Sequence, residues 1–237
     1  MTNELFILLV TALSLAVIHT LAGPDHYLPF IVISRARNWS MKKTSWFTVI
    51  CGLGHVGSSI LLGFIGIAVG IGLSKIILIE DVRGSIVSWL FTAFGLVYMV
   101  WALIRILRGR RHNHLHFHSN GTMHLHTHAH QAEHLHVHDA KGKSGLTPWI
   151  LFTLFIFGPC EPLIPIVMYP AAKHQFQDLI IVTTAFSLVT IGTMLTIVTI
   201  SFYGIKMIPM RFLEKYTHIL AGGTIFLCGI GMLFLGL

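Results

Sequence analysis

The chain has 237 residues, of which 54% are hydrophobic and only 11% are charged, and its formal net charge is +7. A soluble domain carries about 25% charged residues, so this composition excludes an ordinary soluble enzyme and, despite the positive charge, a soluble nucleic-acid-binding protein. The three cysteines all lie in apolar stretches, which gives no sign of a disulfide framework. The sequence therefore predicts an integral membrane protein of the all-α class.

Apolar windows long enough to cross a bilayer recur along the chain. A transmembrane helix needs about 20 mostly apolar residues. The first window has no basic residue before it and no small-residue cleavage site after it, so we expect a retained span and not a signal peptide. The six predicted spans are 5–22, 44–73, 85–107, 148–171, 179–205 and 216–237.

The basic residues predict the orientation of these spans. Thirteen of the sixteen Lys and Arg residues fall in the loops after the first, third and fifth spans, and three fall on the opposite side. Loops rich in Lys and Arg face the cytoplasm. We therefore expect a protein of the plasma (inner) membrane with both termini outside and the central loop in the cytoplasm, and the net charge implies no nucleic-acid partner.

Two Gly-Pro motifs indicate an internal repeat. Gly23-Pro24-Asp25-His26 is echoed by Gly158-Pro159-Cys160-Glu161, 135 residues later. Proline inside a helix removes a hydrogen bond and breaks it, so the first and fourth spans should be interrupted. Repeats of three spans must run in opposite directions, as in many secondary transporters. The predicted division is a first three-helix repeat at 1–108, a cytoplasmic loop at 109–146 and a second three-helix repeat at 147–237.

Ionisable side chains lie where the spans should be apolar. A charge at the centre of a span costs about 2.5–3.5 kcal/mol, which marks such residues as functional candidates. Imidazole, carboxylate and thiolate together suit a first-row divalent transition metal better than Mg²⁺ or Ca²⁺. The predicted transport-site ligands are His19, Asp25, His26 and His55 from the first half, and Cys160 and Glu161 from the second.

Simpler roles for these residues stay open at this point. His55 and Glu161 can each form an interhelical hydrogen bond, and Asp25 can cap a helix that begins at Tyr27. Cys160 can either point inward as a ligand or pack among its neighbours. Glu161 can also exchange a proton for the ion instead of binding it.

Eleven of the sixteen histidines crowd into the central loop, where they alternate with small or apolar residues. Such tracts bind transition metals through their composition, without a fixed geometry. We predict a disordered segment that gathers metal or regulates transport; a solvated linker is the alternative. The accessory histidines are His112, His114, His116, His118, His124, His126, His128, His130, His134, His136 and His138.

The residues from His19 to His26, followed by Leu53-Gly54-His55, resemble signatures of the nickel/cobalt transporter superfamily, especially its UreH-like (urease-accessory-type) branch. The resemblance implies membrane transport of Ni²⁺ or Co²⁺, with His19, Asp25, His26 and His55 at the signature positions. The chain departs from the signatures of that superfamily in two places, and both bear on which metal is bound. Five residues instead of four separate His19 from Asp25, and Val56 stands where the second signature has a hydroxyl residue after its histidine. Efflux members of that superfamily carry a histidine-rich loop at mid-chain.

These observations predict a secondary transporter, not an enzyme, with no fixed cofactor. The cargo is Ni²⁺ or Co²⁺ first and Zn²⁺ second, export is favoured over uptake, and a cytoplasmic metal chaperone is a candidate partner. The sequence gives no oligomeric state. The main alternative is a membrane thiol-redox protein of the CcdA and DsbD kind, or a sulfite or organic-anion exporter. A thiol relay needs a cysteine in each half, whereas Asp25 stands at the position that corresponds to Cys160.

Overall fold

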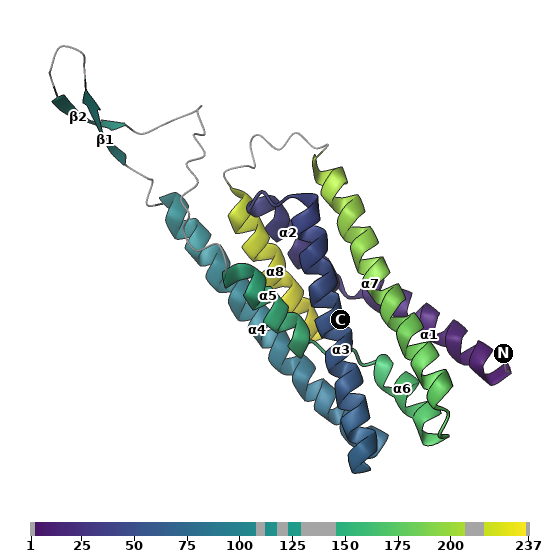
Figure 1. Ribbon diagram of the computed structural model, residues 1–237. Coiled ribbons are helices and arrows are strands. Elements are labelled where there is room, and N and C mark those ends of the chain that lie inside the picture. Colours follow the sequence, from purple (N-terminus) through teal and green to yellow (C-terminus); the bar gives the residue numbers. More distant parts are fainter. Residues whose placement is uncertain (1–2, 108–111, 118–122, 129–145, 207–215, 236–237) are drawn as a thin grey trace.

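The computed structural model describes residues 3–107, 112–117, 123–128, 146–206 and 216–235 (Figure 1). Apart from one short hairpin, the described elements are helical. In chain order the helical elements are α1 (Asn3–Ala22), the 3₁₀ turn η1 (Pro24–His26), α2 (Leu28–Ala36), α3 (Met41–Val69), α4 (Leu73–Leu107), α5 (Leu146–Phe157), α6 (Leu163–Ala172), α7 (Phe176–Lys206) and α8 (Thr217–Leu235).

Five of these helices, α1, α3, α4, α7 and α8, are long and apolar enough to cross a membrane. Large apolar side chains cover their outer surfaces: Trp89, Val97, Leu188, Ile200 and Leu227 are each more than 60% exposed. Soluble proteins rarely expose apolar patches of more than a few hundred Å². The helices and their apolar surface together indicate a transmembrane protein.

The chain is interrupted at both predicted Gly-Pro motifs. The first interruption separates α1 from α2, with Pro24 as the first residue of η1 and Pro29 in the first turn of α2. The second separates α5 from α6, with Pro159 and Pro162 in the gap. Helices α5 and α6 have only 12 and 10 residues, so the predicted span at 148–171 consists of two half-length helices.

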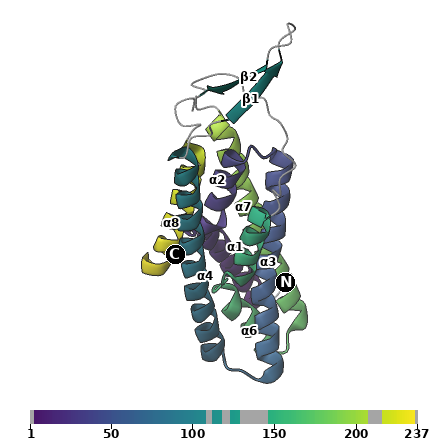
Figure 2. The same cartoon turned by 90° about the vertical axis from the view of Figure 1, so that its left-hand side faces the viewer.

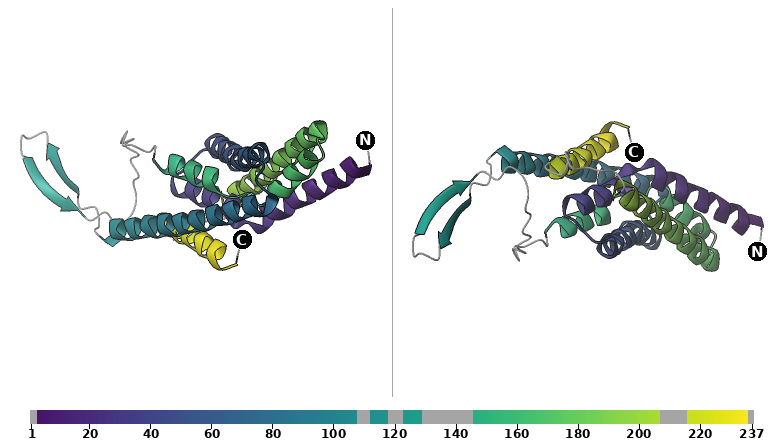
Figure 3. Two further views of the ribbon diagram at one scale, coloured as in Figure 1. Left: turned by 90° about the horizontal axis from the view of Figure 1, so that it is seen from below. Right: turned by 90° about the horizontal axis from the view of Figure 1, so that it is seen from above.

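The helices form an elongated bundle with two distinct ends. Helices α2, α4 and α7 end, and α3 and α8 begin, at the end drawn at the top in Figures 1 and 2. The turn from α3 to α4 and the turn from α6 to α7 lie at the opposite end. The N-terminal part of α1 projects sideways from the bundle (Figure 3).

Small residues bring α4 and α8 into close contact along the bundle (Figure 3). A Cβ atom on Gly95 would collide with the backbone of Phe226, and one on Gly222 would collide with the backbone of Met99. Helices in lipid associate through van der Waals contact, which small residues permit. The glycines therefore set the spacing of this pair.

We expect Gly95→Ala and Gly222→Ala each to destabilise the protein by about 1–3 kcal/mol, because overpacking forces the two helix backbones apart. The measurement is the thermal unfolding midpoint in detergent. Gly192→Ala in α7 is the matched control, since its new methyl group meets no atom within 4 Å. Equal midpoints for all three variants would show that α4 and α8 do not depend on this contact.

One sequence prediction needs correction. The third span was predicted to begin at residue 85, but α4 begins at Leu73 and has 35 residues. At about 1.5 Å per residue it is about 52 Å long. Glu80 and Arg83 lie within it as an ion pair. The charges before residue 85 argued against a membrane span there, and this pairing is how the helix accommodates two of them.

Parts of the histidine-rich loop lie among the described residues. Two of its segments form an antiparallel hairpin, β1 (His112–Phe117) and β2 (Met123–His128). Alternation of two residue kinds has the period of a strand, which explains why these segments pair. The register places His112, His114 and His116 opposite His128, His126 and His124. His118, His130, His134, His136 and His138 lie outside the described residues.

Candidate metal-binding site

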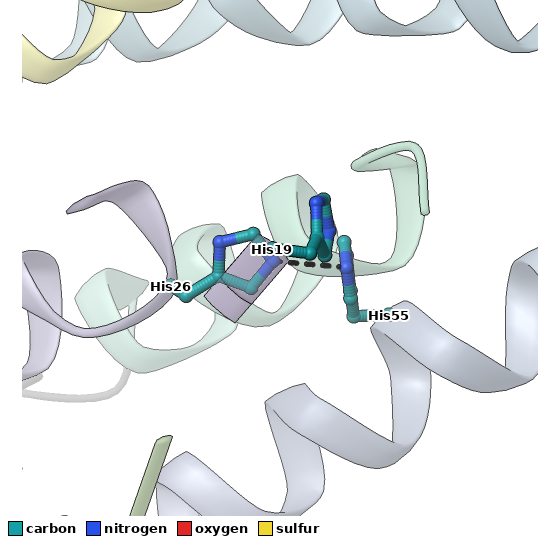
Figure 4. Close-up of side chains that lie close together, drawn as sticks. All are labelled: His19, His26 and His55. Atoms are coloured by element: carbon teal, nitrogen blue, oxygen red, sulfur yellow. Dashed lines mark hydrogen bonds between the residues drawn. The ribbon is translucent and has the colours of Figure 1, made fainter. Parts of the chain in front are cut away.

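Three histidines from three elements point toward one another (Figure 4). His19 lies near the end of α1, His26 ends η1, and His55 is at the middle of α3. One ring nitrogen from each lies within 4.8 Å of the others. We call this group the histidine triad.

The break after α1 determines the direction of the His26 ring. Its Nδ1 lies 3.1 Å from the Gly23 carbonyl oxygen and 3.2 Å from Asp25 Oδ1. Both partners accept hydrogen bonds, so Nδ1 carries the proton and donates it, and Nε2 keeps its lone pair. This arrangement of a carboxylate behind an imidazole is the usual support of a metal-binding histidine.

Close packing leaves little room for a side chain at Gly23. A Cβ atom there would lie against Nδ1 of His26 and Oδ1 of Asp25. The second Gly-Pro motif is also close to a histidine, because a Cβ atom on Gly158 would lie 3.1 Å from Nδ1 of His55 and would push the ring by a few tenths of an ångström. Each motif glycine therefore lets the backbone of a helix break approach a triad histidine closely.

His26 and His55 face each other through Nε2, at a distance of 3.2 Å. With a proton on one nitrogen, the contact is a hydrogen bond, drawn as a dashed line in Figure 4. With both nitrogens deprotonated, the same spacing suits two neighbouring ligands of one ion, since metal–nitrogen bonds of about 2.0–2.1 Å place such ligands roughly 3 Å apart.

His19 supplies the third nitrogen. Its Nε2 is buried and has no hydrogen-bond partner among the described residues. Its ring centroid lies 4.7 Å from that of His26 and 6.2 Å from that of His55. Buried polar atoms in proteins are nearly always paired, so an unpaired nitrogen beside two other imidazoles points to a ligand that completes the group.

Carboxylates lie beside the triad in a cavity of about 120 Å³. Its walls include His19, Asp25, His26 and Glu161. A water molecule occupies about 30 Å³, so the cavity has room for an ion that keeps part of its hydration. Asp25 supports His26 from behind, and Glu161 faces the cavity from the break between α5 and α6.

The other predicted ligand, Cys160, is placed differently. It is fully buried and packs in an apolar cluster with Val56, Leu163 and Phe186. Its backbone N–H donates to Ser59 Oγ at 3.1 Å. In the described part of the chain, the ligand atoms that lie within 4.8 Å of one another are those of the histidine triad, and the Cys160 thiol is not among them.

Sequence reasoning missed the pair formed by Glu80 and Arg83. Arg83 Nη1 donates to Glu80 Oε1 at 2.9 Å, and the Glu80 side chain is 0% exposed. The signal was available: opposite charges three residues apart lie on one face of a helix, and they stand here in an apolar segment. Both residues precede residue 85, where the predicted third span begins.

Comparison with protein-family models, with curated proteins and with solved structures found no match. The resemblance to nickel/cobalt transporters thus rests on the motifs around His19, His26 and His55. The function has to be argued from the site itself.

Proposed function

We propose that the chain is a secondary transporter of a divalent transition metal, Ni²⁺ or Co²⁺ first and Zn²⁺ second. The observation that carries the proposal is the convergence of three imidazole nitrogens within 4.8 Å at a helix break. In this proposal α1–α2 and α5–α6 are broken spans, so the chain crosses the membrane six times as two inverted halves.

The chemistry of the triad supports such a cargo. Neutral imidazole suits first-row transition metals, whereas Mg²⁺ and Ca²⁺ prefer oxygen ligands. Three protein ligands leave further coordination positions for water or for a carboxylate such as Glu161. A site of this kind can bind an ion without enclosing it, which is what release on the other side of the membrane requires.

A second cavity that adjoins the triad supports transport over permanent metal binding. A second cavity, of about 190 Å³, is lined by Asp81, Ser85 and Ser88 of α4 and shares Pro159, Glu161 and Met232 with the cavity at the triad. The exposed Asp81 lies toward the start of α4. In this proposal the two adjoining cavities form a polar route to the histidines.

Toward the other end, buried aromatic rings cover the triad. Phe155 lies 6.3 Å from His55, 4.8 Å from Phe30 and 6.3 Å from Phe91, measured between ring centroids. A site open on one side and closed on the other is one state of an alternating-access cycle. With the histidine-rich loop in the cytoplasm, the open side faces outward, and export remains favoured because the loop would collect ions inside.

Accumulation of radioactive nickel or cobalt in cells that express the chain tests the proposal. Lower accumulation than in control cells means export, and higher accumulation means uptake. The plasma-membrane location and the orientation can be checked in the same cells by protease access to the loop. Unchanged accumulation of every metal in a panel that includes zinc, manganese and iron would rule out the proposed function.

The Gly23 contact gives a prediction for the site. We expect Gly23→Ala to raise the metal concentration for half-maximal flux about tenfold, because the new methyl group displaces the His26 ring from its position over the Gly23 carbonyl. Flux into proteoliposomes is the measurement. Gly57→Ala in α3 is the control, as its methyl group meets nothing within 4 Å; equal curves would place His26 outside the ion pathway.

A further inference from the structure

Arg83 reaches from α4 across the break between α5 and α6. Its Nη2 donates to the carbonyl oxygen of Gly158 at 2.8 Å, with that of Ile156 at 3.3 Å as a weaker acceptor that shares a hydrogen, and its Nε donates to that of Phe157 at 3.2 Å. The last carbonyls of a helix have no partner within it, and an unsatisfied carbonyl at membrane depth is costly. The guanidinium therefore replaces the hydrogen bonds that α5 loses where it stops.

The same guanidinium is linked to His55 through α3. Nη2 also donates to Ser58 Oγ at 2.9 Å, and Ser58 Oγ donates to the backbone carbonyl of His55 at 2.9 Å. From the other side, Gly158, whose carbonyl Arg83 binds, lies directly against the His55 ring. Arg83 thus contacts Ser58, which is bonded to the His55 carbonyl, and the Gly158 backbone beside the His55 ring, although its own side chain does not line the cavity at the triad.

Glu80 makes this arrangement compatible with a bound cation. A guanidinium close to the triad would repel a divalent ion, and inside a protein that repulsion is much stronger than in water. The fully buried Glu80 carboxylate lies 2.9 Å from Arg83 Nη1 and neutralises it. The pair can bind the carbonyls of α5 without adding net positive charge beside the histidines.

We infer that Arg83, neutralised by Glu80, is a positioning residue that keeps the α5–α6 break and His55 in the geometry for binding a metal ion. The inference rests on the proposed function, since it assigns the pair a role at the same site. It requires the planar fork of arginine: a lysine ammonium carries the same charge but cannot bind three carbonyls and Ser58 together.

Cobalt binding to the full-length protein in detergent tests the inference. Co²⁺ bound by nitrogen and oxygen ligands absorbs visible light with a spectrum that depends on the ligand geometry. The loop histidines bind Co²⁺ too, so the signal of the triad is the difference between the wild type and His26→Ala. Thermal unfolding midpoints are recorded for every variant.

We expect Arg83→Lys to weaken the triad signal at least tenfold and to change its spectrum. Glu80→Gln, which keeps the shape but leaves Arg83 uncompensated, should weaken Co²⁺ binding by a similar factor. The double variant Glu80→Gln/Arg83→Gln should lose no more than either single variant, because residues of one network are not additive. Lys75→Gln, an exposed charge on the same helix, should behave as wild type.

Ser58→Ala tests the inference even if the Arg83 and Glu80 variants fail to fold. It removes only the link between Arg83 and the His55 carbonyl, and we expect a three- to tenfold weaker triad signal with a nearly unchanged unfolding midpoint. If Ser58→Ala and Arg83→Lys bind Co²⁺ with wild-type affinity and spectrum, and at most unfold at a lower temperature, the pair only caps α5. That result would overturn the inference but not the proposed function. A wild-type protein without any His26-dependent signal would instead remove the proposed function and the inference with it.

Discussion

His26→Ala is expected to reduce metal flux in proteoliposomes at least a hundredfold at low ion concentration. His26 is the central member of the triad, since its ring lies 4.7 Å from His19 and 4.8 Å from His55, whereas those two lie 6.2 Å apart. Losing a residue that supports a metal ligand usually costs 10- to 100-fold in affinity, so losing the central ligand should cost more. His19→Ala and His55→Ala should follow in the same direction.

His174→Ala is the matched control for this loss. His174 is exposed in the turn between α6 and α7, and its replacement should leave the flux unchanged. Because His26 is buried, His26→Gln, which keeps most of the volume, distinguishes a lost ligand from a damaged fold. Wild-type flux in a well-folded His26→Gln protein would show that the triad does not bind the transported ion.

Asp25→Asn has the second largest expected effect, about a tenfold increase in the metal concentration for half-maximal flux. The carboxylate lies 3.2 Å from His26 Nδ1 and lines the cavity at the triad. The negative charge of Asp25 strengthens the imidazole as a ligand and attracts the cation. The amide of asparagine keeps the shape and one acceptor oxygen but removes this charge. The maximal rate should change less than the half-saturating concentration.

Asp178→Asn, at the first turn of α7, removes a carboxylate away from the triad and should have no such effect. A maximal rate that falls while the half-saturating concentration stays constant would contradict the binding role of Asp25. It would indicate instead that the carboxylate controls the opening of the site, because Asp25 also lines the small void beside Phe91 and Phe155.

Much of the architecture could be predicted from local chemistry. The apolar windows predicted membrane helices, and five of them are long and apolar enough to span a bilayer. Pro24, Pro159 and Pro162 lack the N–H that a helix needs, so the interruptions at these residues followed from the sequence. The hairpin in the histidine-rich loop agrees with the period-two alternation of its residues.

The candidate site, too, could be predicted only in part from the sequence. His19, Asp25, His26 and His55 could be selected because polar groups are costly in an apolar span, and the structure brings the three histidines together. That Asp25 supports His26, that Cys160 packs among apolar side chains, and that Glu161 faces the cavity depend on how distant segments pack. No local rule gives these directions.

The sequence by itself determined which residues are out of place in a membrane and where the helices must break, because both are costs that each residue carries with it. Only the tertiary structure decided what compensates those costs. Arg83 binds carbonyls more than 70 residues away, at Ile156, Phe157 and Gly158, and such a contact exists only after α4 packs against the end of α5. The physical reason is that a broken helix has to be completed by whatever side chain the packing brings to it, and that partner has no fixed spacing along the chain.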